Sequence, residues 1–174
     1  MTTEQIRAFL EQNEIKLLIE DEELEEVYNK CDSTGRADLT EYLLSIGVQP
    51  DEYMKNIPES FLNSSKINSY DISSTVRVIG NYAFINCTSL TNITIPDSVT
   101  IIGHWAFSEC SSLTSLTVGN GVTSIGGYAF NCCGELEINY NGTQKQWEAI
   151  IKKDKAFRRT SCVVHCADGD IIID

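Results

Sequence analysis

The chain has 174 residues, 42% of them hydrophobic and 22% charged, so it is long enough to fold as one or two small domains with a sizeable core. No apolar run approaches the roughly 18 residues of a membrane span, and the first residues lack the basic start and apolar segment of a secretory signal. The net charge of −12 argues against binding to nucleic acid through phosphate contacts and favours a protein partner with a basic patch. We therefore expect a cytoplasmic protein that binds neither nucleic acid nor membrane.

Charge and composition change near Ile57. Residues 1–56 carry 14 acidic and 5 basic residues, whereas residues 57–174 carry 11 acidic and 8 basic ones. Glu and Leu dominate before this point, and Thr, Ser, Asn, Gly and Ile dominate after it. We expect an acidic helical N-terminal domain or cap over residues 1–56, about four repeats over 57–142 and a C-terminal cap over 143–174.

The N-terminal region is predicted to form three or four short helices. Its last helix is expected to start with Asp38 as cap and to end at Gly47, and its apolar side would consist of Leu39, Tyr42, Leu43 and Leu44. An acidic run precedes it and includes Glu22, Glu23 and Glu26. Two interpretations stay open: the region caps the first repeat, or it offers these carboxylates to a basic target.

The second half repeats with a period of 23 residues, and three units are written VRVIGNYAFINCTSLTNITIPDS, VTIIGHWAFSECSSLTSLTVGNG and VTSIGGYAFNCCGELEINYNG. The aligned positions include Val76, Val99 and Val122; Gly80, Gly103 and Gly126; Phe84, Phe107 and Phe130; and Cys87, Cys110 and Cys133. Residues 53–75 fit the same lattice as a degenerate first unit, with Phe61 at the phenylalanine position. The period therefore organises everything from Tyr53 onward.

Each unit contains recognisable pieces of secondary structure. The alternation Leu-x-x-Ile-x-Ile is typical of a half-buried strand, Val-x-x-Ile-Gly of a second short strand, and Pro-Asp or Gly-Asn of a turn. The piece x-x-Ala-Phe-x-x-Cys is predicted to form a turn of helix that fills the coil with Phe. Because one unit cannot bury its own apolar face, we expect stacked units to form a short solenoid with a parallel β ladder.

The repeat pattern I-G-x-x-A-F-x-x-C-x-x-L-x-x-I-x-I-P-x-S-V resembles the BspA-like leucine-rich repeat family. The stretches YNGTQKQWEAI (140–150) and VVHCADGDI (163–171) resemble the closing segment of such proteins. The resemblance implies an α+β fold, a short leucine-rich-repeat solenoid capped by the N-terminal α-helical domain, that binds proteins or surfaces without catalysis. Many members are secreted adhesins, whereas compact relatives resemble small proteins of phages and mobile elements.

Seven cysteines are expected to be thiols rather than disulfides. The three at the repeat distance should stack as small buried residues inside the coil. Cys162, His165 and Cys166 are soft ligands in one short segment, but their spacing matches no zinc motif well. We therefore predict no metal and no other cofactor.

Two surfaces are candidates for partner binding. A row of aromatic residues precedes the Ala-Phe pairs and should point toward solvent, with His104 beside it: Tyr82, Trp105 and Tyr128. The outward positions of the long strands form a polar face that includes Asn92, Thr94, Ser115 and Thr117. The opposing interpretations are packing between units for the aromatic row and a plain solvated sheet face for the polar residues.

No nucleophile elbow, P-loop or phosphate-binding glycine loop is present in the sequence, so no catalytic residue is predicted. The main hypothesis is an interaction module that binds a cytoplasmic protein, and its specific version is a phage or mobile-element inhibitor of a host defence protein. The alternatives are a surface adhesin fragment and a small-ligand-binding protein. The sequence leaves open whether two copies of the chain associate.

Overall fold

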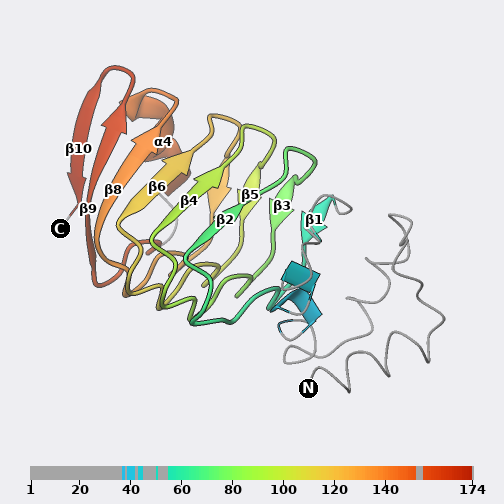
Figure 1. The fold of residues 1–174 in the computed structure, drawn as a ribbon. Coiled ribbons are helices and arrows are strands. Elements are labelled where there is room, and N and C mark those ends of the chain that lie inside the picture. Colours follow the sequence, from blue (N-terminus) through green and yellow to red (C-terminus); the bar gives the residue numbers. More distant parts are fainter. Residues whose placement is uncertain are drawn as a thin grey trace.

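A computed structural model describes residues 37, 39–41, 43–44, 50, 55–151 and 155–173. Over these residues the chain winds as a coil whose turns are stacked in chain order, from β1 at one end to β10 at the other (Figure 1). The expected leucine-rich-repeat solenoid with a parallel ladder is confirmed, and its strands form two sheets on opposite sides of each turn.

The longer strands form a six-stranded sheet with the order β10-β9-β8-β6-β4-β2. Their bounds are β2 (Ser69–Asp71), β4 (Asn92–Ile95), β6 (Ser115–Val118), β8 (Gly134–Tyr140), β9 (Thr160–Cys166) and β10 (Gly169–Ile173). All neighbours are parallel except β9 and β10, which pair antiparallel. Ile93 lies opposite Leu116, and Leu116 lies opposite Ile138, so the apolar position of each turn continues into the next. This register places one face of the sheet in the core.

The short extended pieces form a second, parallel sheet of four strands. These strands are β1 (Asn56–Ile57), β3 (Val78–Ile79), β5 (Ile101–Ile102) and β7 (Ser124–Ile125). A glycine follows three of them because the turns approach closely there. A Cβ atom on Gly103 would lie 2.6 Å from the backbone nitrogen of Asn81. The Ile-Gly pair of the repeat is therefore a packing requirement.

The segment from Tyr82 to Cys87 is not helical, and the expected helical turn is wrong. Tyr82 and Asn86 adopt left-handed backbone conformations, with φ of 56° and 58°. The backbone N–H of Phe84 donates to Ala106 of the next turn at 2.7 Å, whereas the N–H groups of Ile85 and Cys87 close isolated turns on Tyr82 and Phe84. The same geometry recurs in the following turns, so this arc forms a third ladder of hydrogen bonds between turns. We call the segment that leads from the short strand to the long strand of each turn the arc, and in the turn just described it includes Tyr82 to Cys87.

A column of stacked phenylalanine rings fills the coil. The Phe84 and Phe107 centroids are 5.1 Å apart with an interplanar angle of 3°, and those of Phe107 and Phe130 are 5.3 Å apart at 2°. All three side chains are fully buried. Phe157 extends the column, 5.2 Å from Phe130. The interior column predicted from the period is thus confirmed, and it continues beyond the four expected units.

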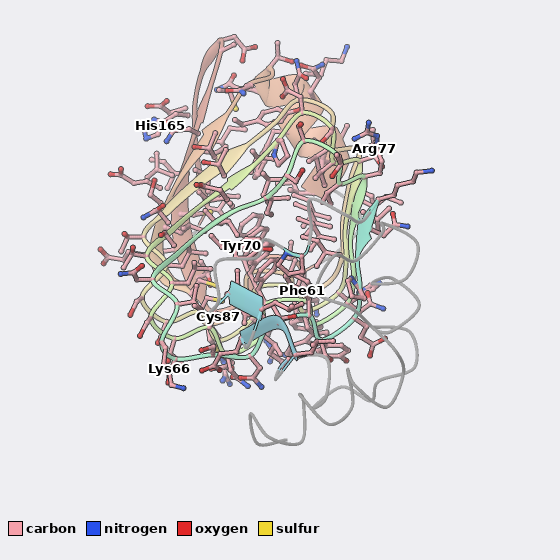
Figure 2. The ribbon with its side chains drawn as sticks, turned by 45° about the vertical axis from the view of Figure 1, so that its right-hand side comes forward. Phe61, Lys66, Tyr70, Arg77, Cys87 and His165 are labelled. Atoms are coloured by element: carbon pink, nitrogen blue, oxygen red, sulfur yellow. The ribbon has the colours of Figure 1, made fainter. Side chains whose placement is uncertain are left out.

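The first turn is out of register by one residue. The N–H of Leu62 donates to Ala83, just as the N–H of Phe84 donates to Ala106, so Leu62 and not Phe61 occupies the repeat's phenylalanine position. Phe61 nevertheless reaches the core and meets Phe84 at 69° instead of stacking on it. Figure 2 shows Phe61, Tyr70 and Cys87 inside the coil and Lys66, Arg77 and His165 on its outside.

The described residues of the N-terminal region pack on this first turn. The backbone is already helical at Ala37, so the helix does not begin after Asp38 as expected. Leu39 and Leu43 are buried in the same core cluster as Phe61, and Lys66 forms an ion pair with Glu41. The earlier predicted helices lie outside the described residues.

The C-terminal segment begins with α4 (Gln144–Ile151), which contacts β7 at the end of the four-stranded sheet. Its Trp147 is fully buried, with its ring 5.0 Å from Tyr140 and 6.0 Å from Phe157. After α4 the chain returns to the repeat geometry, since β9 extends the parallel ladder. The helix therefore replaces the short strand of one further turn.

Candidate interaction surface

The three aromatic residues singled out in the sequence form one continuous stack on the outside of the arc. The centroids of Tyr82 and Trp105 are 6.4 Å apart at 12°, and those of Trp105 and Tyr128 are 4.5 Å apart at 20°. The cause is the repeat itself, because equivalent positions lie above one another in successive turns. We call Tyr82, Trp105 and Tyr128 the aromatic ladder.

The backbone of the aromatic ladder is strained. Its three residues have φ of 56°, 58° and 61°, in the left-handed region that bulky residues rarely adopt. Such a conformation costs on the order of 1 kcal/mol or more at each position. The hydrogen bonds between turns along the arc compensate for this cost. Since glycine or asparagine would fit this backbone more easily, the conformation alone does not explain why large aromatic residues stand here.

The ladder is partly open to solvent. Tyr82 is 37% exposed, and Trp105 and Tyr128 are partly exposed. Between these rings and the other described residues, the structure records no hydrogen bond from the two phenol hydroxyls or the indole N–H. The ladder therefore offers apolar rings with free polar tips, the combination that makes Tyr and Trp effective at protein interfaces.

His104 lies beside the ladder and has a structural role. Its backbone N–H donates to the Asn81 Oδ1 atom at 2.9 Å, and its Nδ1 atom accepts a hydrogen bond from the Gly127 N–H at 2.9 Å. Asn81, His104 and Gly127 are equivalent residues of three turns, so a side chain of each turn satisfies the backbone of the next. Because Nδ1 is an acceptor, the proton of the neutral ring is on Nε2, which remains available to a partner.

Arg158 closes one end of the ladder, and sequence reasoning missed it. Its guanidinium carbon lies 5.7 Å from the centroid of the Tyr128 ring, within the range of a cation–π interaction. No regular spacing links Arg158 to the aromatic ladder, so the sequence carried no signal for this contact.

The outward positions of the six-stranded sheet form the second candidate surface. Asn92 lies opposite Ser115, and Thr94 lies opposite Thr117 in the parallel register. Asn92 and Thr94 are exposed, whereas Ser115 and Thr117 are partly exposed. These residues and the aromatic ladder come from different parts of each turn, so the structure divides the predicted site into two surfaces.

A hollow of about 570 Å³ extends the sheet surface toward β10. Glu135 and Glu137 line one part of it, and Val163 and Ile172 line another. Ile172 is 72% exposed, the largest exposure among the large hydrophobic residues that the structure describes. The sheet surface is therefore polar along β4 and β6, and mixed acidic and apolar where the hollow lies.

The cysteines of the repeat are buried and stacked, and their thiols bond to the backbone. The Sγ atom of Cys110 donates to the Phe84 carbonyl at 3.2 Å, and that of Cys133 to the Phe107 carbonyl at 3.1 Å. Burial raises the pKa of the Cys133 thiol to about 12. The hydroxyl of Thr160 makes the equivalent bond to Phe130 in the last turn, at 2.6 Å. These thiols are structural hydrogen-bond donors.

The segment Cys162 to Cys166 does not gather its three soft ligands. Cys162 and His165 point to opposite faces of β9, because side chains alternate along a strand. Burial raises the pKa of the Cys162 thiol to about 12, and the His165 Nδ1 atom pairs with Asp170 at 3.0 Å. Within the described ranges, no group of three or more His, Cys, Asp or Glu side chains could hold a metal ion.

Three further predicted site residues, Glu22, Glu23 and Glu26, lie outside the described residues. None of the helices in the described part of the chain is both long and apolar enough to traverse a membrane.

The comparisons with known proteins agree with this architecture. The model of the BspA type leucine rich repeat region (6 copies) matches residues 55–162, which is more than half of the chain. The chain therefore belongs to the BspA-type leucine-rich repeat family, whose repeats are typical of non-catalytic protein-interaction or adhesin-like modules. No curated protein and no solved structure matches the chain.

Proposed function

We propose that this protein is a non-catalytic interaction module that binds a cytoplasmic protein through the aromatic ladder. The observation that carries the proposal is the stack of Tyr82, Trp105 and Tyr128, which lies partly exposed on a strained backbone. Tyr and Trp are the residues most enriched where binding energy concentrates in interfaces. Three such residues stand at backbone positions that suit glycine better. Because they cost stability there, binding is the better explanation for their presence.

Electrostatics supports a basic partner. The net charge of −12 produces a negative field that speeds and orients the approach of a positively charged surface. The polar positions Asn92, Thr94, Ser115 and Thr117 would then act as a secondary contact surface, and Glu22, Glu23 and Glu26 remain proposed contacts. Binding should weaken with salt, because long-range attraction between exposed charges is screened.

The experiment compares the wild-type chain with Trp105→Asn as baits for proteins from the source organism. Asparagine is the appropriate replacement because it accepts the left-handed backbone that Trp105 occupies. The captured protein is then purified and titrated against both baits by calorimetry. We expect Trp105→Asn to weaken binding at least tenfold, as for an interface hot spot worth more than about 1.4 kcal/mol.

The matched control is Ile101→Thr, which removes a 43% exposed apolar residue from the four-stranded sheet. Its affinity should equal that of the wild type. Unchanged binding by Trp105→Asn would contradict the proposal, and so would a loss that urea unfolding traces to an unfolded bait.

The same proposal extends to the biological role. A compact acidic protein of a phage or mobile element could inhibit a basic host protein, including a defence protein, by occupying its charged surface. The activity of the captured partner, assayed with and without the chain, tests this step. The adhesin alternative instead predicts that the captured ligand comes from a host surface or matrix.

A further inference from the structure

The aromatic ladder ends where the repeat loses one residue. In the regular turns, the N–H of Trp105 donates to Gly127 and the N–H of Phe107 donates to Ala129. In the last turn, the N–H of Tyr128 donates to Lys155 and the N–H of Phe130 donates to Ala156, the very next residue. The residue that would continue the ladder between them is missing.

Arg158 occupies the space of the missing ring. Its guanidinium lies over the Tyr128 ring, with the central carbon 5.7 Å from the centroid. A guanidinium is planar and weakly hydrated, so it can replace a ring at the end of an aromatic stack better than an ammonium can. Arg158 thus shows, within this chain, that an arginine can terminate the aromatic ladder.

Among the described residues, no cation–π contact is recorded at the opposite end of the ladder. The N–H of Ser60 donates to Asn81 as the N–H of Tyr82 donates to His104, so Ser60 is the equivalent of Tyr82 in the preceding turn. Its hydroxymethyl side chain is too small to cover a ring. Among the described residues, Trp105 is the ring that stacks on Tyr82, which is 37% exposed.

We infer that the face of the Tyr82 ring turned away from Trp105 receives the guanidinium of an arginine on the partner protein. This arginine continues the stack at the Tyr82 end as Arg158 terminates it at the Tyr128 end. The net charge of −12 complements such a residue. The inference rests on the proposed function and names the chemistry that one end of the ladder recognises.

The test titrates the full chain with two short peptides, acetyl-Gly-Arg-Gly-Arg-Gly-amide and its lysine counterpart. NMR follows the ring resonances of Tyr82 and those of the neighbouring Trp105, which every variant retains. We expect the arginine peptide to bind several-fold more tightly than the lysine peptide. Tyr82→Asn should weaken arginine binding about fivefold, as expected for a cation–π contact of about 1 kcal/mol. Tyr82→Phe keeps the ring face and should retain binding, and Ile101→Thr is the control for an unrelated exposed apolar residue.

A gain of binding sharpens the test. Arg158→Ala uncovers the outer face of Tyr128, so the arginine peptide should then perturb the Tyr128 ring as well as the Tyr82 ring. Equal binding of the two peptides, or unchanged binding by a folded Tyr82→Asn variant, would overturn the inference.

The outcome is separable from that of the proposed function. The captured partner's binding could depend on Trp105 while Tyr82→Asn has no effect and the two peptides bind equally. In that case only the arginine inference fails. If no partner depends on Trp105, the proposed function fails whatever the peptides do.

Discussion

Two columns of aromatic rings run along this coil with the same repeat, and they differ in their surroundings. Phe84, Phe107 and Phe130 stack inside the coil with no exposed surface. The aromatic ladder, two positions earlier in each unit, stacks on the outside and is partly exposed to solvent. The repeat explains why both sets stack, since it places equivalent residues one above another.

The residue types explain which column is inside. Phenylalanine has no polar atom and can be buried without a hydrogen-bond partner, whereas Tyr and Trp carry a hydroxyl or an N–H that usually finds a partner when buried. On the outside of the arc, water or a partner can satisfy these groups. The inner column therefore stabilises the coil, and the aromatic ladder is the surface that the coil displays.

The sharpest way to break this comparison is to remove one ring from each column. Phe107→Ala should lower the free energy of unfolding by about 3–5 kcal/mol, because it leaves a cavity between two stacked rings. Trp105→Asn should change it by less than about 1 kcal/mol, because the ring that is lost is partly exposed and backbone strain is relieved. Urea unfolding followed by circular dichroism measures both values.

Phe107→Leu is the conservative control and should cost less than Phe107→Ala, since it fills part of the cavity. If Trp105→Asn destabilises the chain as much as Phe107→Ala does, the ladder is part of the core and the distinction between the two columns is wrong.

The period of 23 residues was enough to predict the two strands of each unit, a parallel ladder, the interior column and the stacked thiols. The alternation around Ile93 and Leu116 determines which face of the long strands is buried. The fixed spacing determines which residues of successive turns stack on one another. These features depend only on periodicity, which the sequence displays directly.

The remaining features depend on geometry that the sequence does not display. Tyr82 and Trp105 are poor indicators of a left-handed backbone, so the arc was expected to be helical. The first turn is shifted by one residue, which exchanges the places of Phe61 and Leu62. A signal was available for the last turn, because Ala156–Phe157 repeats the Ala-Phe pair, but α4 moves it to 27 residues after Phe130 instead of 23.

The buried thiols of the interior make a further prediction, because their burial makes the free energy of unfolding depend on pH. Burial raises the pKa of Cys133 and of Cys162 to about 12, from an ordinary value of 9.0. Above pH 9 the unfolded chain therefore loses thiol protons that the folded chain keeps, so stability falls as pH rises. Each of these thiols should lower the free energy of unfolding by about 1.4 kcal/mol between roughly pH 8 and pH 10.

Urea unfolding of the wild type and of Cys133→Ala over this pH range measures the effect. The variant should be less stable at pH 8 but lose less stability on going to pH 10, because alanine has no proton to lose. Parallel pH profiles for the two proteins would show that Cys133 does not titrate differently on folding.

His104 gives the smallest effect and tests whether a residue on the exposed side can still be structural. Its Nδ1 atom accepts the hydrogen bond of the Gly127 N–H, and Gly127 is buried. His104→Ala leaves that donor unsatisfied and should cost about 1 kcal/mol. His104→Asn should restore most of the loss, because Asn81 already uses its side-chain oxygen in the same way one turn earlier. If the alanine and asparagine variants have the same free energy of unfolding, lower than that of the wild type, then the imidazole ring stabilises the turn and its acceptor atom does not. If partner titrations separate the two variants while their stabilities agree, the exposed edge of His104 belongs to the interface beside Trp105.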